Sequence, residues 1–137
     1  MSPIIGEIKN GWCHFDLEGF HGRASYVRDV PHDILDGIES YQKTKTCVID
    51  FDEEGSEFHL VLHDDNDAYI IVERETVECI VLDTPGNEIF LQLCRDIADN
   101  LPLWEMFNYS GEKDLELRAR CIELDIKDGL PSSHVEI

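Results

Sequence analysis

The sequence predicts an α+β domain in which an antiparallel β-sheet, formed by a hairpin plus a three-stranded meander, is packed by two to three helices. Several short segments alternate apolar and polar residues between turn residues, as strands do. Two longer segments carry apolar residues at helical spacing. The chain has 137 residues, 42% of them hydrophobic, and no repeat, linker or low-complexity tract divides it. Residues 1–137 are therefore expected to form a single domain around one core.

The first third of the chain predicts a hairpin followed by a helix. Residues 12–18 (WCHFDLE) and 22–27 (GRASYV) are expected to be strands around the glycine-containing turn GFHG. Apolar residues then recur at helical spacing from Val30, and Pro31 lies near the first helical position. This helix is expected to end near Gln42.

The alternation in residues 46–75 predicts the register of the strands. If residues 53–56 form a four-residue turn, every large apolar pair falls on one face of the sheet. A slip of one residue would turn that face toward water, so the pattern itself favours this pairing. The expected pairs are Asp52 with Glu57, Phe51 with Phe58, Asp50 with His59, Ile49 with Leu60, Val48 with Val61 and Cys47 with Leu62.

A second turn at residues 64–67 would complete the three-stranded meander. It would pair Leu62 with Tyr69 and Leu60 with Ile71. Residues 77–83 (VECIVLD) are expected to add a further strand.

Two helices are expected in the last third of the chain. The apolar stripe in residues 88–101 (EIFLQLCRDIADNL) predicts a helix that Pro102 ends or bends. Beyond Tyr109 the alternation is compatible with a strand, whereas the spacing of Leu117, Cys121 and Leu124 is typical of a helix, which we favour.

The balance of charge restricts the class of partner. Thirty Asp and Glu residues against eleven Lys and Arg residues give a formal net charge of −19. Such a charge opposes contact with nucleic acid phosphates or anionic lipid, so we expect neither nucleic acid nor a membrane as partner. A partner would be a basic protein. The alternative interpretation is that the charge only keeps the protein soluble.

The N-terminal residues and the cysteines indicate a cytoplasmic protein. Residues 1–12 (MSPIIGEIKNGW) contain no basic leader followed by an apolar run, and no segment approaches the roughly 20 apolar residues that span a bilayer. The five cysteines are odd in number, and none forms a Cys-x-x-Cys pair. Most of them are expected to be reduced and to lie in the core. They are Cys13, Cys47, Cys79, Cys94 and Cys121.

The stretch DFDEEGSEFHLVLHDDND (50–67) contains eight carboxylates, but it does not match a known metal motif. An EF-hand loop that began at Asp50 would need a bidentate Glu at its twelfth position, where the chain has Val61. His59 and His63 lie on a predicted strand, which would separate them by about 13 Å. We therefore expect no metal and no cofactor, and we interpret His59 as a cross-strand partner of Asp50.

The same stretch does not predict a catalytic site. In a meander the two turns lie at opposite ends of the sheet, so Glu53 and Glu54 are kept away from Asp64 and Asp65. Neither a glycine-rich phosphate loop nor a nucleophile motif such as G-x-S-x-G is present. We therefore expect no catalytic residue and no enzymatic activity.

Two further interpretations stay open. A metal-dependent hydrolase could hold magnesium with Asp50, Asp52 and Glu57. A DNA mimic would place its carboxylates along an elongated face. A cysteine–histidine pair also stays open, because such partners meet in space rather than in sequence.

The chain resembles the immunity proteins of bacterial contact-dependent inhibition and polymorphic-toxin systems. The resemblance covers residues 12–101 and consists of size, charge and the order of elements: a hairpin, the helix VPHDILDGIESY and the hairpin CVIDFDEEGSEFHLVLH. It implies tight binding to a cognate toxin, often a basic nuclease whose substrate groove the immunity protein covers with its acids.

The candidate partner-binding residues follow from the most concentrated group of acids. They are Asp50, Asp52, Glu53, Glu54, Glu57 and His59. Affinity also needs apolar anchors, because charges at the rim of an interface add little. The candidate anchors, each of which also suits the core, are Trp12, Trp104, Phe107 and Tyr109.

Overall fold

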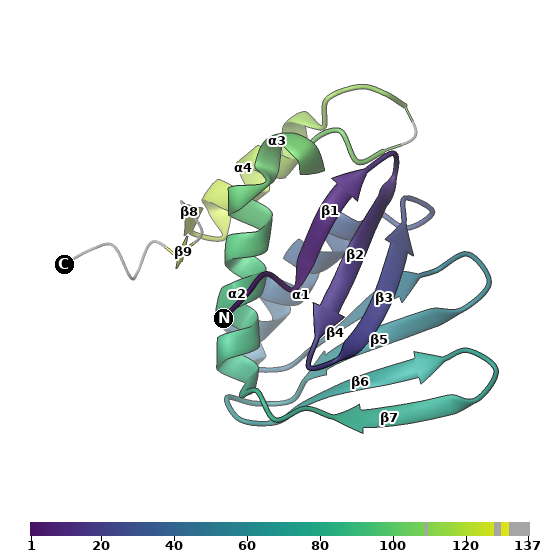
Figure 1. The fold of residues 1–137 in the computed structure, drawn as a ribbon. Coiled ribbons are helices and arrows are strands. Elements are labelled where there is room, and N and C mark those ends of the chain that lie inside the picture. Colours follow the sequence, from purple (N-terminus) through teal and green to yellow (C-terminus); the bar gives the residue numbers. More distant parts are fainter. Residues whose placement is uncertain (109, 128–129, 132–137) are drawn as a thin grey trace.

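The computed structural model of the chain describes residues 1–108, 110–127 and 130–131. It shows a small α+β domain, as the sequence predicts, but its strands form separate antiparallel sheets and not the one sheet expected. Figure 1 shows the three-stranded sheet β1–β3 standing steeply over the four-stranded sheet β4–β7. In order along the chain the elements are β1 (Ile5–Lys9), β2 (Trp12–Leu17), β3 (Phe20–Ser25), α1 (Val30–Thr44), β4 (Cys47–Asp52), β5 (Glu57–Leu62), β6 (Ala68–Glu73), β7 (Val77–Val81), α2 (Gly86–Asp99), α3 (Leu101–Trp104), α4 (Leu115–Glu123), β8 (Ile126–Lys127) and β9 (Leu130–Pro131).

Tight turns extend the predicted N-terminal hairpin to three strands. The turn between β2 and β3 consists of Glu18 and Gly19, which both have positive φ, and it pairs Leu17 with Phe20. The prediction of a four-residue turn GFHG is therefore wrong, since its last three residues belong to β3. A two-residue turn of this kind is favoured because it matches the twist of the strands. A second turn with positive φ at both residues, Asn10-Gly11, adds β1, which we did not predict.

Helix α1 confirms the prediction from Val30 onward and ends at Thr44, two residues beyond Gln42. Pro31 lies in its first turn. The helix approaches β4 closely at Gly37, where a Cβ atom would lie 2.5 Å from Cγ1 of Ile49. A glycine is therefore required at this crossing, although glycine weakens a helix interior.

The register of β4 and β5 is confirmed at all six predicted pairs, from Asp52 with Glu57 to Cys47 with Leu62. The register of β5 and β6 differs from the prediction by one residue, because Leu62 pairs with Ala68 and Leu60 with Ile70. Asp64 causes the difference. Its carboxylate accepts hydrogen bonds from the amides of Asn66 and Asp67, which tightens the loop by one residue.

The last third of the chain contains the two helices expected from the spacing of its apolar residues. Helix α2 ends at Asp99, and Pro102 lies in the first turn of the short helix α3. Helix α4 confirms the helical interpretation of the residues around Leu117 and Cys121, which are buried.

The core joins both sheets and the helices. The ring of Phe15 on β2 lies 5.3 Å from that of Phe51 and 5.1 Å from that of Phe58, which binds the two sheets together. Asp96 on α2 is buried, and its carboxylate accepts hydrogen bonds from the amides of Ile4 and Ile5 at 2.9 and 3.0 Å. These bonds attach the start of the chain to α2.

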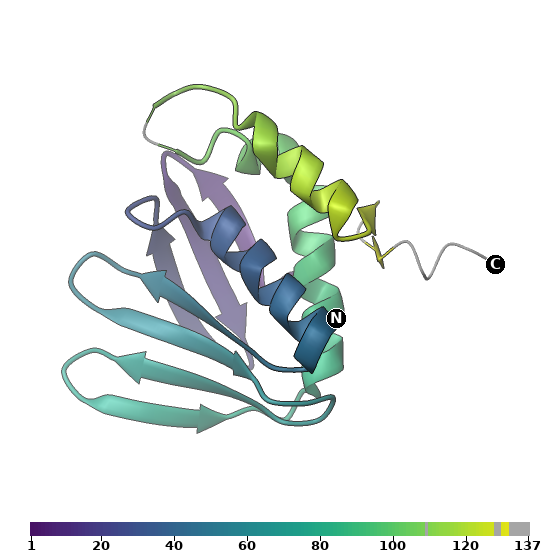
Figure 2. The same cartoon turned by 180° about the vertical axis from the view of Figure 1, so that it is seen from behind.

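Helices α1 and α2 and the β1–β3 sheet lie on one side of the four-stranded sheet, as Figures 1 and 2 show. The inward residues of β4–β6 are buried against them. Four cysteines are buried as expected, whereas Cys79 on β7 is exposed. Within the described ranges, no helix has the length and apolar character that a bilayer-crossing segment needs.

Candidate functional site

The candidate site is the outer face of the four-stranded sheet, opposite the core. Alternate residues of β4–β7 form three rows across it. The first row is Val48, Val61, Tyr69 and Val81; the second is Asp50, His59, Ile71 and Cys79; the third is Asp52, Glu57, Glu73 and Val77. These twelve residues are called the outer face below. The end formed by the third row is acidic, whereas most of the apolar residues occupy the first row and the side formed by β7.

The apolar part of the outer face is open to solvent. Val48, Val77 and Val81 are 59%, 71% and 70% exposed. Tyr69 and Ile71 between them are half-buried. Valine side chains exposed together on one sheet face are typical of a surface that another molecule covers.

His59 is the centre of the acidic part. Its Nδ1 lies 2.6 Å from Oδ1 of Asp50 on β4, and its Nε2 lies 2.5 Å from Oε2 of Glu73 on β6. Partial burial disfavours the protonated ring, but the hydrogen bonds with Asp50 and Glu73 outweigh it and raise the pKa of His59. The side chain is 17% exposed, so the ring lies near the surface.

Two glutamates share the edge of this cluster. A hydrogen bond with Glu73, and to a lesser extent desolvation, raise the pKa of Glu57. The hydrogen bonds of Glu73 with His59 and Glu57 lower the pKa of Glu73. The acidic end holds the carboxyl groups of Asp50, Asp52, Glu57 and Glu73 around a single imidazole, so it attracts a cation whether or not the ring is protonated.

The structure brings together four of the six predicted partner-binding residues. Asp50, Asp52, Glu57 and His59 all lie on the outer face. Glu54 lies at the tip of the β4–β5 turn with φ of 61°, and Asp52 accepts a hydrogen bond from its amide at 2.7 Å. Whether these residues bind a partner stays a prediction.

Glu53 does not face the same way as its neighbours on the outer face, and its carboxylate is engaged within the protein. Its carboxylate accepts hydrogen bonds from Arg74 at 2.8 and 3.0 Å, from the Ser56 hydroxyl at 2.8 Å and from the Arg23 amide at 3.2 Å. Desolvation raises the pKa of Glu53, but these donors outweigh it and lower the pKa overall. Glu53 fastens the β4–β5 turn to β3 and to the β6–β7 loop.

Sequence reasoning missed Glu73 and the apolar part of the outer face. Residues 68–73 (AYIIVE) are apolar on both faces of the strand, so alternation alone does not show which residues point inward. The run itself was the available signal, because a strand with two apolar faces must bury or pair both of them.

The acids at the other end of the sheet hold the fold together, in agreement with their predicted separation from Glu54. Asp65 lies 3.2 Å from Nζ of Lys45 and accepts a hydrogen bond from the Tyr41 hydroxyl at 3.3 Å. The backbone carbonyls of Asp65 and Asn66, in the β5–β6 loop, accept hydrogen bonds from the first amides of α2.

Two of the predicted apolar anchors, Trp104 and Phe107, are buried and do not lie on an open surface. Trp104 and Phe107 are 1% and 4% exposed and pack edge to face with 5.3 Å between their ring centres. Both belong to the core because α3 folds back against β1 and α2. Trp12 is half-buried beneath the guanidinium of Arg23, at 4.6 Å. Tyr109 lies outside the described residues.

The atoms that converge well enough to hold a cation differ from the predicted set. They belong to Glu57, His59 and Glu73, whereas the hydrolase interpretation requires Asp50, Asp52 and Glu57. In the described residues, Asp29, His32 and Asp114 form a second such group, and His63, Asp64 and Asp67 a third. His59 and His63 belong to different groups, as expected from their spacing on a strand.

The His32 group is a junction between helices. Nε2 of His32 lies 2.8 Å from Asp114, and Nδ1 lies 3.0 Å from Nη1 of Arg120. Arg120 also donates to Asp36 at 2.7 Å. These contacts join α1 to α4, which explains the group without a ligand.

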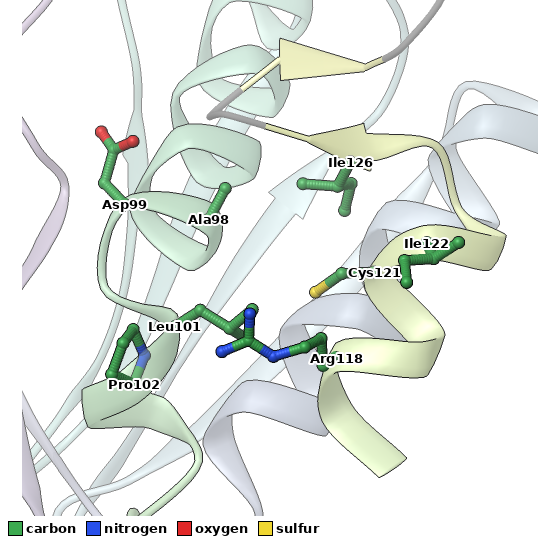
Figure 3. A pocket seen from close by; sticks show the side chains of 8 residues that line it. All are labelled: Ala98, Asp99, Leu101, Pro102, Arg118, Cys121, Ile122 and Ile126. Carbon is green, nitrogen blue, oxygen red and sulfur yellow. The ribbon is translucent and has the colours of Figure 1, made fainter. Parts of the chain in front are cut away.

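A hollow of about 360 Å³ lies between the end of α2, α3, α4 and β8 (Figure 3). The side chains of Arg118 and Cys121 point into it, and the carboxylate of Asp99 points away. Arg118 is held by the buried Glu105 at 3.0 Å. Burial raises the pKa of the Cys121 thiol to about 11, which favours the protonated thiol at neutral pH.

Searches against protein-family models, curated proteins and solved structures found no match for this chain.

Proposed function

We propose that this protein binds and neutralises a basic partner protein, most specifically a toxin of the kind that bacterial immunity proteins inhibit. The observation that carries the proposal is the composition of the outer face, where uncovered valines adjoin a group of carboxylates around His59. Apolar area supplies affinity once it is desolvated, and the carboxylates select a cationic partner.

The charge of the protein supports a role in binding a partner, beyond keeping the protein soluble. A net charge of −19 steers a cationic protein toward this one and raises its association rate by orders of magnitude at low salt. A basic nuclease would be a suitable target, because its groove attracts phosphates and would attract carboxylates in the same way. The partner would then lose access to its substrate.

Two variants with the same loss of charge test the proposal. The site variant carries Asp50→Asn, Asp52→Asn, Glu57→Gln and Glu73→Gln. The control variant carries Glu88→Gln, Glu112→Gln, Glu116→Gln and Glu123→Gln, four exposed acids away from the outer face. Each variant and the natural chain are used to capture proteins from cells of the source organism, and the captured protein is purified for association kinetics.

The expected result is a basic partner that binds the control variant like the natural chain. The site variant should associate about tenfold more slowly at low salt, with a weaker dependence of rate on salt. Co-expression of the natural chain should also relieve the toxicity of the partner. Equal rates for both variants, or a partner that is not basic, would contradict the proposal.

A further inference from the structure

The outer edge of β7 (Val77–Val81) is unpaired in the described part of the chain. The strand order in this sheet is β4-β5-β6-β7, so β4 and β7 are its two edges. Helix α1 packs on β4, and Arg28 reaches Asp50 of that strand at 3.8 Å. Strand β7 has no comparable neighbour beyond it, and Figure 1 shows it at the margin of the molecule.

The backbone of β7 presents donors and acceptors outward. The amide of Leu82 donates to the carbonyl of Ala68, and that of Arg74 to the carbonyl of Thr76, at 3.0 and 3.1 Å. Because hydrogen-bonded pairs alternate along an antiparallel ladder, Glu78 and Ile80 bond to β6. The amides and carbonyls of Val77, Cys79 and Val81 therefore point away from the sheet.

This edge has one of the devices that usually prevent strand pairing, the charged side chain of Glu78 on the inner side of the sheet, and lacks the others. Natural edge strands carry lysines, prolines or bulges, or are covered by a loop or helix. The sequence of β7 is VECIV, without lysine or proline, and its register with β6 is regular over all five residues. An edge of this kind is a template for an added strand.

The charges around β7 select a basic occupant. Glu73, Glu75, Glu78 and Asp83 lie on β7 or immediately beside it. The one cation among residues 73–83, Arg74, is paired with Glu53. A second copy of this chain would bring the same acids to the same place, and like charges would oppose the pairing.

We propose that an extended basic segment of the partner adds to β7 as a fifth strand of the sheet. The inference rests on the proposed function and gives its binding mode. Alternate side chains of the added strand would extend the outer face beside Val77 and Val81. We expect these side chains of the partner to be apolar. The others would lie on the side of Glu78 and are expected to be lysine or arginine.

A pair of substitutions at one position tests the added hydrogen bonds. Cys79→Pro removes an amide that points outward and is tolerated in an edge strand, whereas Cys79→Val keeps the amide at similar size. The probe is a short peptide of alternating lysine and valine, blocked at both ends. A version methylated on its backbone nitrogens carries the same charge but lacks the donors.

The expected result is that the peptide slows hydrogen exchange at the amides of Val77, Cys79 and Val81 in the natural chain. It should bind the Cys79→Val variant like the natural chain and the Cys79→Pro variant about tenfold more weakly. The methylated peptide should give no protection. The exchange measurement needs only the natural chain, so the inference stays testable if the proline variant does not fold.

Different outcomes separate this inference from the proposed function. If the peptide protects none of the three amides and binds both Cys79 variants equally, strand addition is wrong. In that case the proposed function is retained if the site variant (Asp50→Asn, Asp52→Asn, Glu57→Gln, Glu73→Gln) still associates more slowly with the captured basic partner. It is contradicted if the site variant associates with that partner like the natural chain. Self-association that a bismaleimide traps through Cys79, the one exposed cysteine, would assign the edge to a second copy and overturn the inference.

Discussion

At the scale of single residues, neighbouring acids have opposite roles. Glu53 is 12% exposed in its side chain and ties two loops to β3. Glu54, the next residue, is exposed at the tip of the turn. Asp50 and Glu73 hold the ring of His59 from both sides. The direction of each side chain, rather than its charge, decides whether the residue stabilises the fold or remains available to a partner.

The stability contribution of His59 should depend on pH. Its pKa is raised in the folded protein, so the contribution is fully present below the unfolded value of about 6.5 and is lost as the pH rises through the folded value. We expect His59→Gln to lower the free energy of unfolding by about 1 kcal/mol near pH 6, and by less near pH 9. Denaturant unfolding at several pH values measures this.

The control for His59 is His63→Gln, because the side chain of His63 is 65% exposed on the following loop. That variant should follow the natural chain at every pH. A constant difference between His59→Gln and the natural chain from pH 6 to pH 9 would show that the imidazolium is not stabilised by its carboxylates.

At the scale of elements, short turns set the geometry of both sheets. Asn10-Gly11 and Glu18-Gly19 form two-residue turns with positive φ at each position. The longer β4–β5 turn is instead held from outside, through the carboxylate of Glu53 and its donors Arg74 and Ser56. This anchor joins the four-stranded sheet to the three-stranded one at the end nearest the acidic cluster.

Neutralising Glu53 should loosen this end of the molecule, whereas neutralising Glu54 should not. Hydrogen bonds with a charged group each contribute about 1.5–3 kcal/mol, and a glutamine side chain can keep some of those that Glu53 makes. We therefore expect Glu53→Gln to lower the free energy of unfolding by roughly 1–2 kcal/mol. Glu54→Gln should change stability by less than about 0.5 kcal/mol. Thermal and denaturant unfolding of both variants provide the comparison.

The pH dependence of the Glu53 variant gives a second readout. The pKa of Glu53 is lowered in the folded protein, so its contribution is present above the unfolded value of about 4.3 and is lost as the pH falls through the folded value. The difference between Glu53→Gln and the natural chain should therefore shrink from pH 6 toward pH 3. An equal loss of stability in both glutamine variants would refute the assigned role.

At the scale of the whole molecule, the charge of −19 is distributed over a fold with one covered and one open sheet face. The core joins the inner face of β4–β7 to Phe15 and the helices. The outer face and the edge of β7 lie together on the opposite side. A basic partner would therefore meet apolar area, free backbone groups and carboxylates on one side of the molecule.

Repulsion among the acids should lower the stability of the free protein and should be relieved by salt. Raising sodium chloride from about 20 mM to about 500 mM shortens the screening length several-fold. We expect the free energy of unfolding to rise by about 1 kcal/mol, because screened self-repulsion outweighs the loss of exposed ion pairs. Denaturant unfolding by urea, which is uncharged, measures this. A fall in stability with salt would show that the ion pairs dominate.

The sequence by itself determined the features that depend on local pattern. The alternation from Cys47 to Leu62 fixed one register, because only that register buries Ile49, Phe51, Phe58 and Leu60 together. The stripes of α1 and α2 and the spacing around Leu117 likewise predicted helices that the structure contains.

Only the tertiary structure decided the neighbours of residues whose local pattern is ambiguous. Strand β6 is apolar on both faces, and the one-residue tightening by Asp64 set Glu73, rather than Arg74, opposite Glu57. That shift created the pair of carboxylates around His59. The burial of Trp104, the inward turn of Glu53 and the open edge of β7 were also decided only by the tertiary structure. Each depends on contacts between segments far apart in the chain, and local periodicity contains no information about them.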